Sequence, residues 1–117
     1  MAVTPERLSK RARMQVEENS QELYLSAASA WEIAIKYSIG KLPLPMSAEE
    51  YVPSRAAALR TVPLPIAQAH ALHVATLPFH HHDPFDRLLI AQAQIEDLSI
   101  MTSDPKFAAY DVATIRA

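Results

Sequence analysis

Three acidic residues occupy positions at which carboxylates from distant parts of the chain can converge: Glu32, Asp86 and Asp104. Glu32 comes shortly after an apolar run at 23–26, Asp86 lies in the first turn of a helix predicted over 83–97, and Asp104 follows an apolar run at 98–102. In open α/β sheets, the carboxyl ends of strands and the amino ends of the following helices gather where ligands bind. Clustered carboxylates repel unless a cation compensates, and oxygen ligands without cysteine favour Mg²⁺ or Mn²⁺. The sequence therefore predicts a divalent metal site.

Each acid also has a structural explanation. Glu32 completes an S-x-x-E capping box with Ser29, which predicts a helix start there. Asp83 and Asp86 can cap their helix, and Asp104 can cap a short helix that begins at the next residue. Only the expected convergence of Glu32, Asp86 and Asp104 favours a metal site over helix capping.

Two aromatic residues stand directly before acids. Trp31 precedes Glu32, and Phe85 precedes Asp86. Such rings could stack on nucleobases, but aromatic residues at helical spacing usually belong to the core. The spacing therefore predicts core packing for both rings, with base stacking as the alternative.

The histidines suggest a rival metal site. His82-Asp83, with His70 or His73 upstream and an Asp downstream, superficially resembles the pattern of metal-dependent phosphohydrolases. Those enzymes are all-helical, whereas this sequence contains three or four credible strands. The cluster at 80–82 is more simply interpreted as a solvated turn.

Composition excludes several classes of protein. The 117 residues are 50% hydrophobic and 21% charged, with a net charge of -2 and no cysteine. These values exclude a disordered tail, a protein that coats polyanions, a disulfide scaffold and a thiolate metal site. No apolar run approaches the roughly 18–20 residues of a membrane helix, and charges near the start exclude a signal peptide. We expect a single domain over 1–117, located in the cytoplasm.

Predicted helices and strands alternate along the chain. A helix with a basic outer face begins at Thr4, Gly40 should end a second helix, and a third begins at Ser47 and must be kinked or divided by Pro53. An edge strand follows at 62–66, then a helix over 67–75, and a last strand over 112–115. This alternation predicts an α/β domain with a mainly parallel sheet and helices on both faces.

Four motifs, in this order, resemble a PIN-domain ribonuclease, most closely the VapC-like toxins of bacterial toxin–antitoxin pairs. They are LSAASAWEIAIK at 25–36, GKLPLP at 40–45, HDPFDRLLIAQA at 82–93, and TSD at 102–104 with Tyr110 following. The resemblance extends from about Arg7 to Ile115.

The resemblance implies a three-layer α/β/α fold and metal-dependent endonucleolytic cleavage of RNA. It implies a Mg²⁺ or Mn²⁺ cofactor, a cognate antitoxin as partner, an RNA substrate and a homodimer. Position by position, the implied catalytic and metal-binding residues are Glu32, Asp86 and Asp104, and the auxiliary ones are Asp83, Lys36, Arg87, Thr102 and Ser103. Of these, Lys36 and Arg87 are candidates for phosphate contacts.

The chain departs from the family at its beginning. Family members start with an apolar central strand that ends in a metal-binding Asp, whereas the first Asp here is Asp83. We therefore expect an N-terminally truncated or misassigned chain, impaired in activity, whose flanking strands move together or recruit a strand from another chain. The alternative function is a catalytically inactive module that binds an antitoxin and dimerises.

Overall fold

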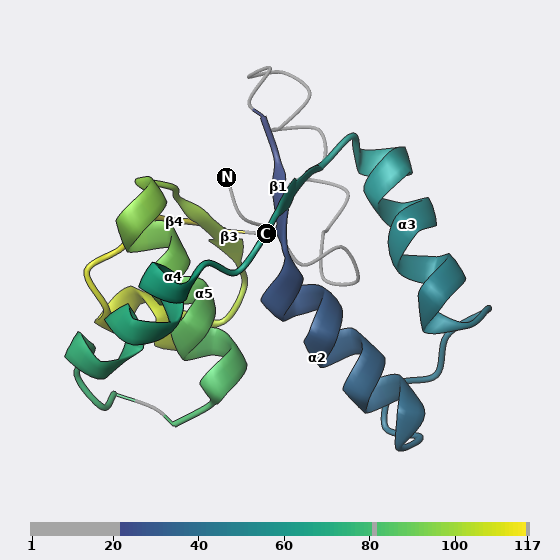
Figure 1. Cartoon of the computed structure of the whole chain (residues 1–117), viewed down its shortest axis with the longest axis horizontal. Helices are drawn as coiled ribbons and strands as arrows, with labels where there is room; N and C mark the ends of the chain where they lie inside the picture. The colour runs from purple at the N-terminus through teal and green to yellow at the C-terminus, as the bar shows by residue number, and fades with distance from the viewer. Residues whose placement is uncertain (1–21, 81, 117) are drawn as a thin grey trace.

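The computed structural model of the chain describes residues 22–80 and 82–116 (Figure 1). The predicted first helix and its basic face therefore lie outside the described residues. The elements, in chain order, are β1 (Tyr24–Ser26), α2 (Ala27–Ser38), α3 (Ala48–Leu59), β2 (Val62–Leu64), α4 (Gln68–His73), the 3-10 helix η2 (Val74–Thr76), α5 (Pro84–Glu96), β3 (Ile100–Thr102), the 3-10 helix η3 (Pro105–Ala109) and β4 (Thr114–Arg116).

The strands form two parallel pairs. In one pair, Tyr24 of β1 lies opposite Val62 of β2, and in the other, Ile100 of β3 lies opposite Thr114 of β4. Figure 1 shows α2 and α3 beside the β1–β2 pair, and α4 and α5 with the β3–β4 pair on the other side of the molecule. The predicted parallel α/β architecture is confirmed. Within the described ranges, however, no ladder joins β1 to β3, so the two pairs do not form one continuous sheet there.

The start of α2 differs from the predicted capping box. The N-cap is Ser26, whose Oγ accepts a hydrogen bond from the amide of Ala28 at 3.0 Å. Ser29 and Glu32 are buried residues inside the helix, so the predicted start at Ser29 is wrong. The end is as expected, because Gly40 has φ 75°, a conformation that favours glycine, and its amide donates to the carbonyl of Tyr37.

The other helix boundaries mostly follow the sequence. Ser47 caps α3 as predicted. Of the two predicted effects of Pro53, a kink or a division, the division does not occur, because the helix is continuous through this residue. Asp83 caps α5, with Pro84 in the first position, as the sequence indicates. None of the helices in the described part is long and apolar enough to cross a membrane.

A buried glutamine connects α5 to the β1–β2 pair. The side chain of Gln92 is completely buried; its Nε2 donates to the carbonyl of Pro65 at 3.1 Å, and its Oε1 accepts from the hydroxyl of Ser26. Its partners lie at the end of β1 and just after β2. Gln92 therefore fastens α5 to the carboxyl ends of both strands.

We expect Gln92→Leu to lower the free energy of unfolding by roughly 1–3 kcal/mol, because the Ser26 hydroxyl and the Pro65 carbonyl lose a buried partner. Urea unfolding followed by circular dichroism measures the change. The matched control is Gln68→Leu at the exposed start of α4, which should change stability by less than about 0.5 kcal/mol. Equal effects of the two substitutions would contradict the connecting role.

Candidate metal centre

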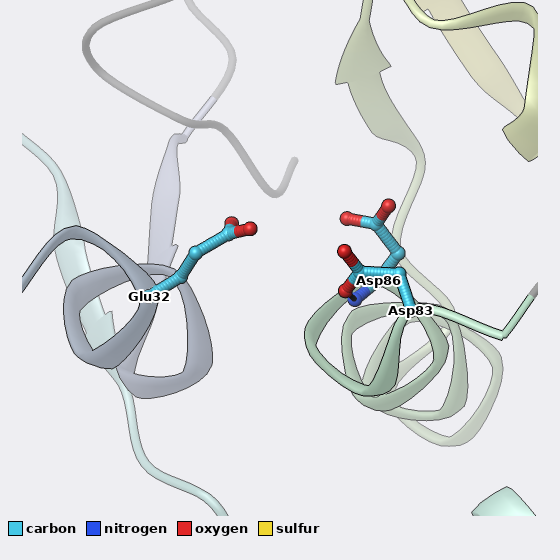
Figure 2. A group of neighbouring side chains, drawn as sticks. All are labelled: Glu32, Asp83 and Asp86. Carbon is cyan, nitrogen blue, oxygen red and sulfur yellow. Dashed lines mark hydrogen bonds between the residues drawn. The ribbon is translucent and has the colours of Figure 1, made fainter. Parts of the chain in front are cut away.

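Three carboxylates meet between the amino-terminal part of α5 and α2. Glu32, Asp83 and Asp86 each offer one oxygen, and these oxygens lie within 4.8 Å of one another. Figure 2 shows Glu32 extending from α2 toward the two aspartates at the start of α5. We call these residues the carboxylate group. Glu32 is 8% exposed, Asp86 is half-buried and Asp83 is exposed.

Local structure brings these side chains together. Glu32 lies in the second turn of α2, on the helix face that also buries Ala28 and Ile33. Asp83 is the N-cap of α5, and Asp86 lies in the first turn of the same helix. The amino end of a helix carries a partial positive charge, which lowers the cost of placing the two aspartates side by side.

The carboxylates have partners within the chain. Lys36 Nζ lies 3.0 Å from Glu32 Oε2, one turn further along α2. Asp83 Oδ1 accepts hydrogen bonds from the amides of Phe85 at 2.9 Å and Asp86 at 3.1 Å. These contacts hold Glu32 and Asp83 in place, and Lys36 balances one negative charge.

The donor set fits a hard divalent cation. All three residues offer oxygen, and Mg²⁺ binds oxygen at about 2.0–2.1 Å, which places opposite ligands about 4.2 Å apart. The oxygens of the carboxylate group are spaced on this scale. Glu32, Asp83 and Asp86 are therefore the residues that would hold such an ion.

A small pocket lies beside the carboxylate group. It is lined by Ser29, Glu32, Phe85, Asp86, Leu89, Ile100, Thr102 and Phe107. Its volume is about 10 Å³, close to the minimum that one water molecule needs. Because Thr102 ends β3, the pocket lies at the carboxyl end of that strand, where ligand sites in open α/β sheets are expected.

Asp104 is not a member of the carboxylate group. Its Oδ1 accepts from the amide of Lys106 at 3.0 Å and so caps η3, and its own amide donates to Thr102 Oγ1 at 3.0 Å. Of the three acids expected to converge, the described structure gathers Glu32 and Asp86, with Asp83 as the third member. Ser103, which the resemblance implied as an auxiliary residue of the site, is exposed.

The two predicted phosphate contacts have different surroundings. The Lys36 side chain is 41% exposed beside Glu32 and can reach a ligand. Arg87 is 5% exposed, and its guanidinium donates to the carbonyls of Pro78, Val74 and Leu77. Arg87 therefore holds the segment before α5 in place. Its buried guanidinium is not exposed for the phosphate contact that was expected of it.

Trp31 does not belong to the core. It is 56% exposed, and its ring contacts that of Phe85 edge to face, with centroids 5.1 Å apart. The prediction of core packing is therefore wrong for Trp31. Phe85 is half-buried and lines the pocket.

The histidines do not form the rival metal site. His70 Nε2 contacts Glu96 Oε1 at 2.8 Å, and His73 Nε2 contacts Gln94 Oε1 at 2.7 Å. Both partners lie near the carboxyl end of α5, opposite to the end that carries Asp83. Of the residues that the structure describes, only the carboxylate group has the spacing of a metal site.

Three comparisons relate this chain to known proteins. A family model described as PIN domain matches residues 2–113. Ribonuclease VapC16 of Mycobacterium tuberculosis is 48% identical over 58 residues, which cover 50% of this chain and 41% of that protein. The match to this chain thus covers about two-fifths of the length of that relative.

Two solved structures share the fold over nearly the whole chain. DNA-bound VapBC from Salmonella typhimurium has a TM-score of 0.70 at 13% identity and covers 98% of this chain and 96% of that one. FitAcB from Neisseria gonorrhoeae has a TM-score of 0.60 at 21% identity, with 99% and 97% covered. At these identities the likeness establishes the fold.

We expect Asp83→Asn to weaken Mn²⁺ binding without loss of stability. Asparagine caps helices as well as aspartate does, so the substitution removes charge while it keeps the cap. The expected loss of affinity is about tenfold or more, since removing even an outer partner of a metal ligand commonly has an effect of this size. Titration calorimetry with Mn²⁺ measures the affinity, and thermal unfolding checks the cap.

Asp97→Asn is the matched control. Asp97 ends the same helix in a left-handed conformation, φ 54°, which asparagine also tolerates. The affinity of the Asp97→Asn variant for Mn²⁺ should equal that of the unmodified protein. An equal loss of affinity in both variants would show that only overall charge matters.

Proposed function

Because this chain belongs to the PIN-domain family, we propose that it is an endoribonuclease toxin of a bacterial type II toxin–antitoxin pair, dependent on Mg²⁺ or Mn²⁺ and acting in the cytoplasm. The observation that carries the proposal is the carboxylate group between α2 and α5. The similarity to Ribonuclease VapC16 over half of the chain supports the choice of RNA as substrate.

In this proposal Glu32, Asp83 and Asp86 hold the cation. When bound, a divalent cation lowers the pKa of a coordinated water and stabilises negative charge on a phosphate. The chain contributes placement: Lys36 orients the Glu32 carboxylate, and the amides at the start of α5 orient that of Asp83. The exposed ammonium of Lys36 is also the group that we propose contacts a phosphate oxygen.

Asp104 has a secondary part in this proposal. It lies two residues after Thr102, which lines the pocket, but its carboxylate is engaged in capping η3. It is not among the acids whose oxygens lie within 4.8 Å of one another. We therefore expect substitution of Asp104 to have a smaller effect on cleavage than substitution of Asp86.

The partner that we propose is a cognate antitoxin protein, with a homodimer of this chain as the assembly. The support is that the solved structures that share this fold include those of DNA-bound VapBC and of FitAcB. Copurification of a small protein encoded beside this chain would test the partner, independently of the test of cleavage.

We expect Asp86→Asn to abolish metal-dependent cleavage of single-stranded RNA. A loss of several kcal/mol of charge stabilisation corresponds to a rate at least about 100-fold lower. Gel analysis of labelled RNA with Mn²⁺, or with EDTA, measures cleavage, and Asp97→Asn is the control that should remain active. If the unmodified protein cleaves nothing yet still binds a small partner, the inactive binding module replaces this proposal.

A further inference from the structure

The exposed Trp31 and its partner Phe85 stand directly beside the carboxylate group. Trp31 precedes Glu32 on α2, and Phe85 precedes Asp86 on α5. Their rings meet with centroids 5.1 Å apart and planes inclined by 74°. The two rings therefore span the same gap between helices that the carboxylates span, and we call them the aromatic pair.

The aromatic pair reaches the pocket through Phe85. Phe85 lines the pocket together with Glu32 and Asp86, and Trp31, whose ring contacts that of Phe85, is 56% exposed. A tryptophan this exposed is unusual, because its large apolar surface favours burial. The exposure thus occurs next to the proposed catalytic residues, where an occupant is expected.

The size of the pocket restricts what can bind there. About 10 Å³ holds at most one water molecule, so a nucleobase cannot enter. A base next to a phosphate at the carboxylate group must therefore lie outside, against the neighbouring surface. The ring of Trp31, in contact with Phe85 of the pocket, is exposed on the neighbouring surface.

We propose that Trp31, supported by Phe85, is a stacking platform for one unpaired base of the substrate, beside the phosphate held at the carboxylate group. This inference rests on the proposed function and adds a positioning residue to it. Stacking on an aromatic ring tolerates every base, so the platform selects single strands over duplexes rather than one sequence over another. The surrounding carboxylates disfavour a protein interface, whose core is usually depleted of charge.

The test is a cycle that combines Trp31→Ala with removal of a base. Binding is measured by fluorescence anisotropy in the Asp86→Asn background, which prevents cleavage, with a short labelled single-stranded RNA and copies that carry one abasic site at each position in turn. Trp31→Ala should weaken binding of intact RNA about 5- to 150-fold. At one position, the abasic RNA should bind equally well with or without Trp31.

Two further measurements separate stacking from a structural role. Trp31 is the only tryptophan, so its fluorescence should be quenched by intact RNA and much less by RNA abasic at that position. Trp31→Phe should retain part of the affinity. The control Tyr37→Ala removes a partly exposed aromatic ring near the other end of α2 and should leave binding unchanged.

The platform is overturned if the losses of binding free energy caused by Trp31→Ala and by removal of a base are additive at every position of the RNA. It is also overturned if saturating RNA leaves the fluorescence of Trp31 unchanged. If Trp31→Ala instead changes the molecular mass in light scattering while RNA affinity is retained, Trp31 belongs to a protein interface. Absence of metal-dependent cleavage would refute the proposed nuclease but not the platform, because binding is measured without cleavage.

Discussion

A buried link between α5 and the β1–β2 pair positions the two halves of the site. Within the described residues no strand ladder connects the β1–β2 pair with the β3–β4 pair, and α2 packs against α5 between them. Gln92 fixes where α5 lies in this packing. Its side-chain amide bonds the Ser26 hydroxyl and the Pro65 carbonyl at the same time, and a shift of α5 would break one or both hydrogen bonds. A buried amide is costly without its partners, so sliding of the helices is disfavoured.

The carboxylate group lies across this same junction. Glu32 belongs to the half that contains β1, and Asp83 and Asp86 belong to the half that contains β3. The distance between these acids is therefore set by helix packing rather than by a loop. Each of the two ends is also locally supported, Glu32 by Lys36 and Asp83 by amides of its own helix. Rigid elements on both sides suit a site that must keep oxygens at coordination distance.

Local signals predicted the elements well, and long-range contacts account for the exceptions. Asp83 before a proline identified the start of α5 because both capping and the fixed φ of proline act within a few residues. The helix start at Ser29 failed because Ser26, which is bonded to a side chain 66 residues away, caps α2 instead. Asp104 was expected in the carboxylate group; it caps η3 and is not a member, whereas Asp83 caps α5 and is one. Helical spacing placed Trp31 in the core, although α2 buries a different face.

The chain connections place the acids on different segments. The β1–β2 ladder lies within residues 24–64 and the β3–β4 ladder within residues 100–116, so each ladder joins residues of one half only. Glu32 meets Asp83 and Asp86 only where the two halves are in contact. Their mutual repulsion therefore opposes that contact, and at spacings within 4.8 Å it is little screened by a Debye length of about 8 Å. A divalent cation that binds only when the acids are together would stabilise the folded protein, by an amount that grows with the concentration of the cation.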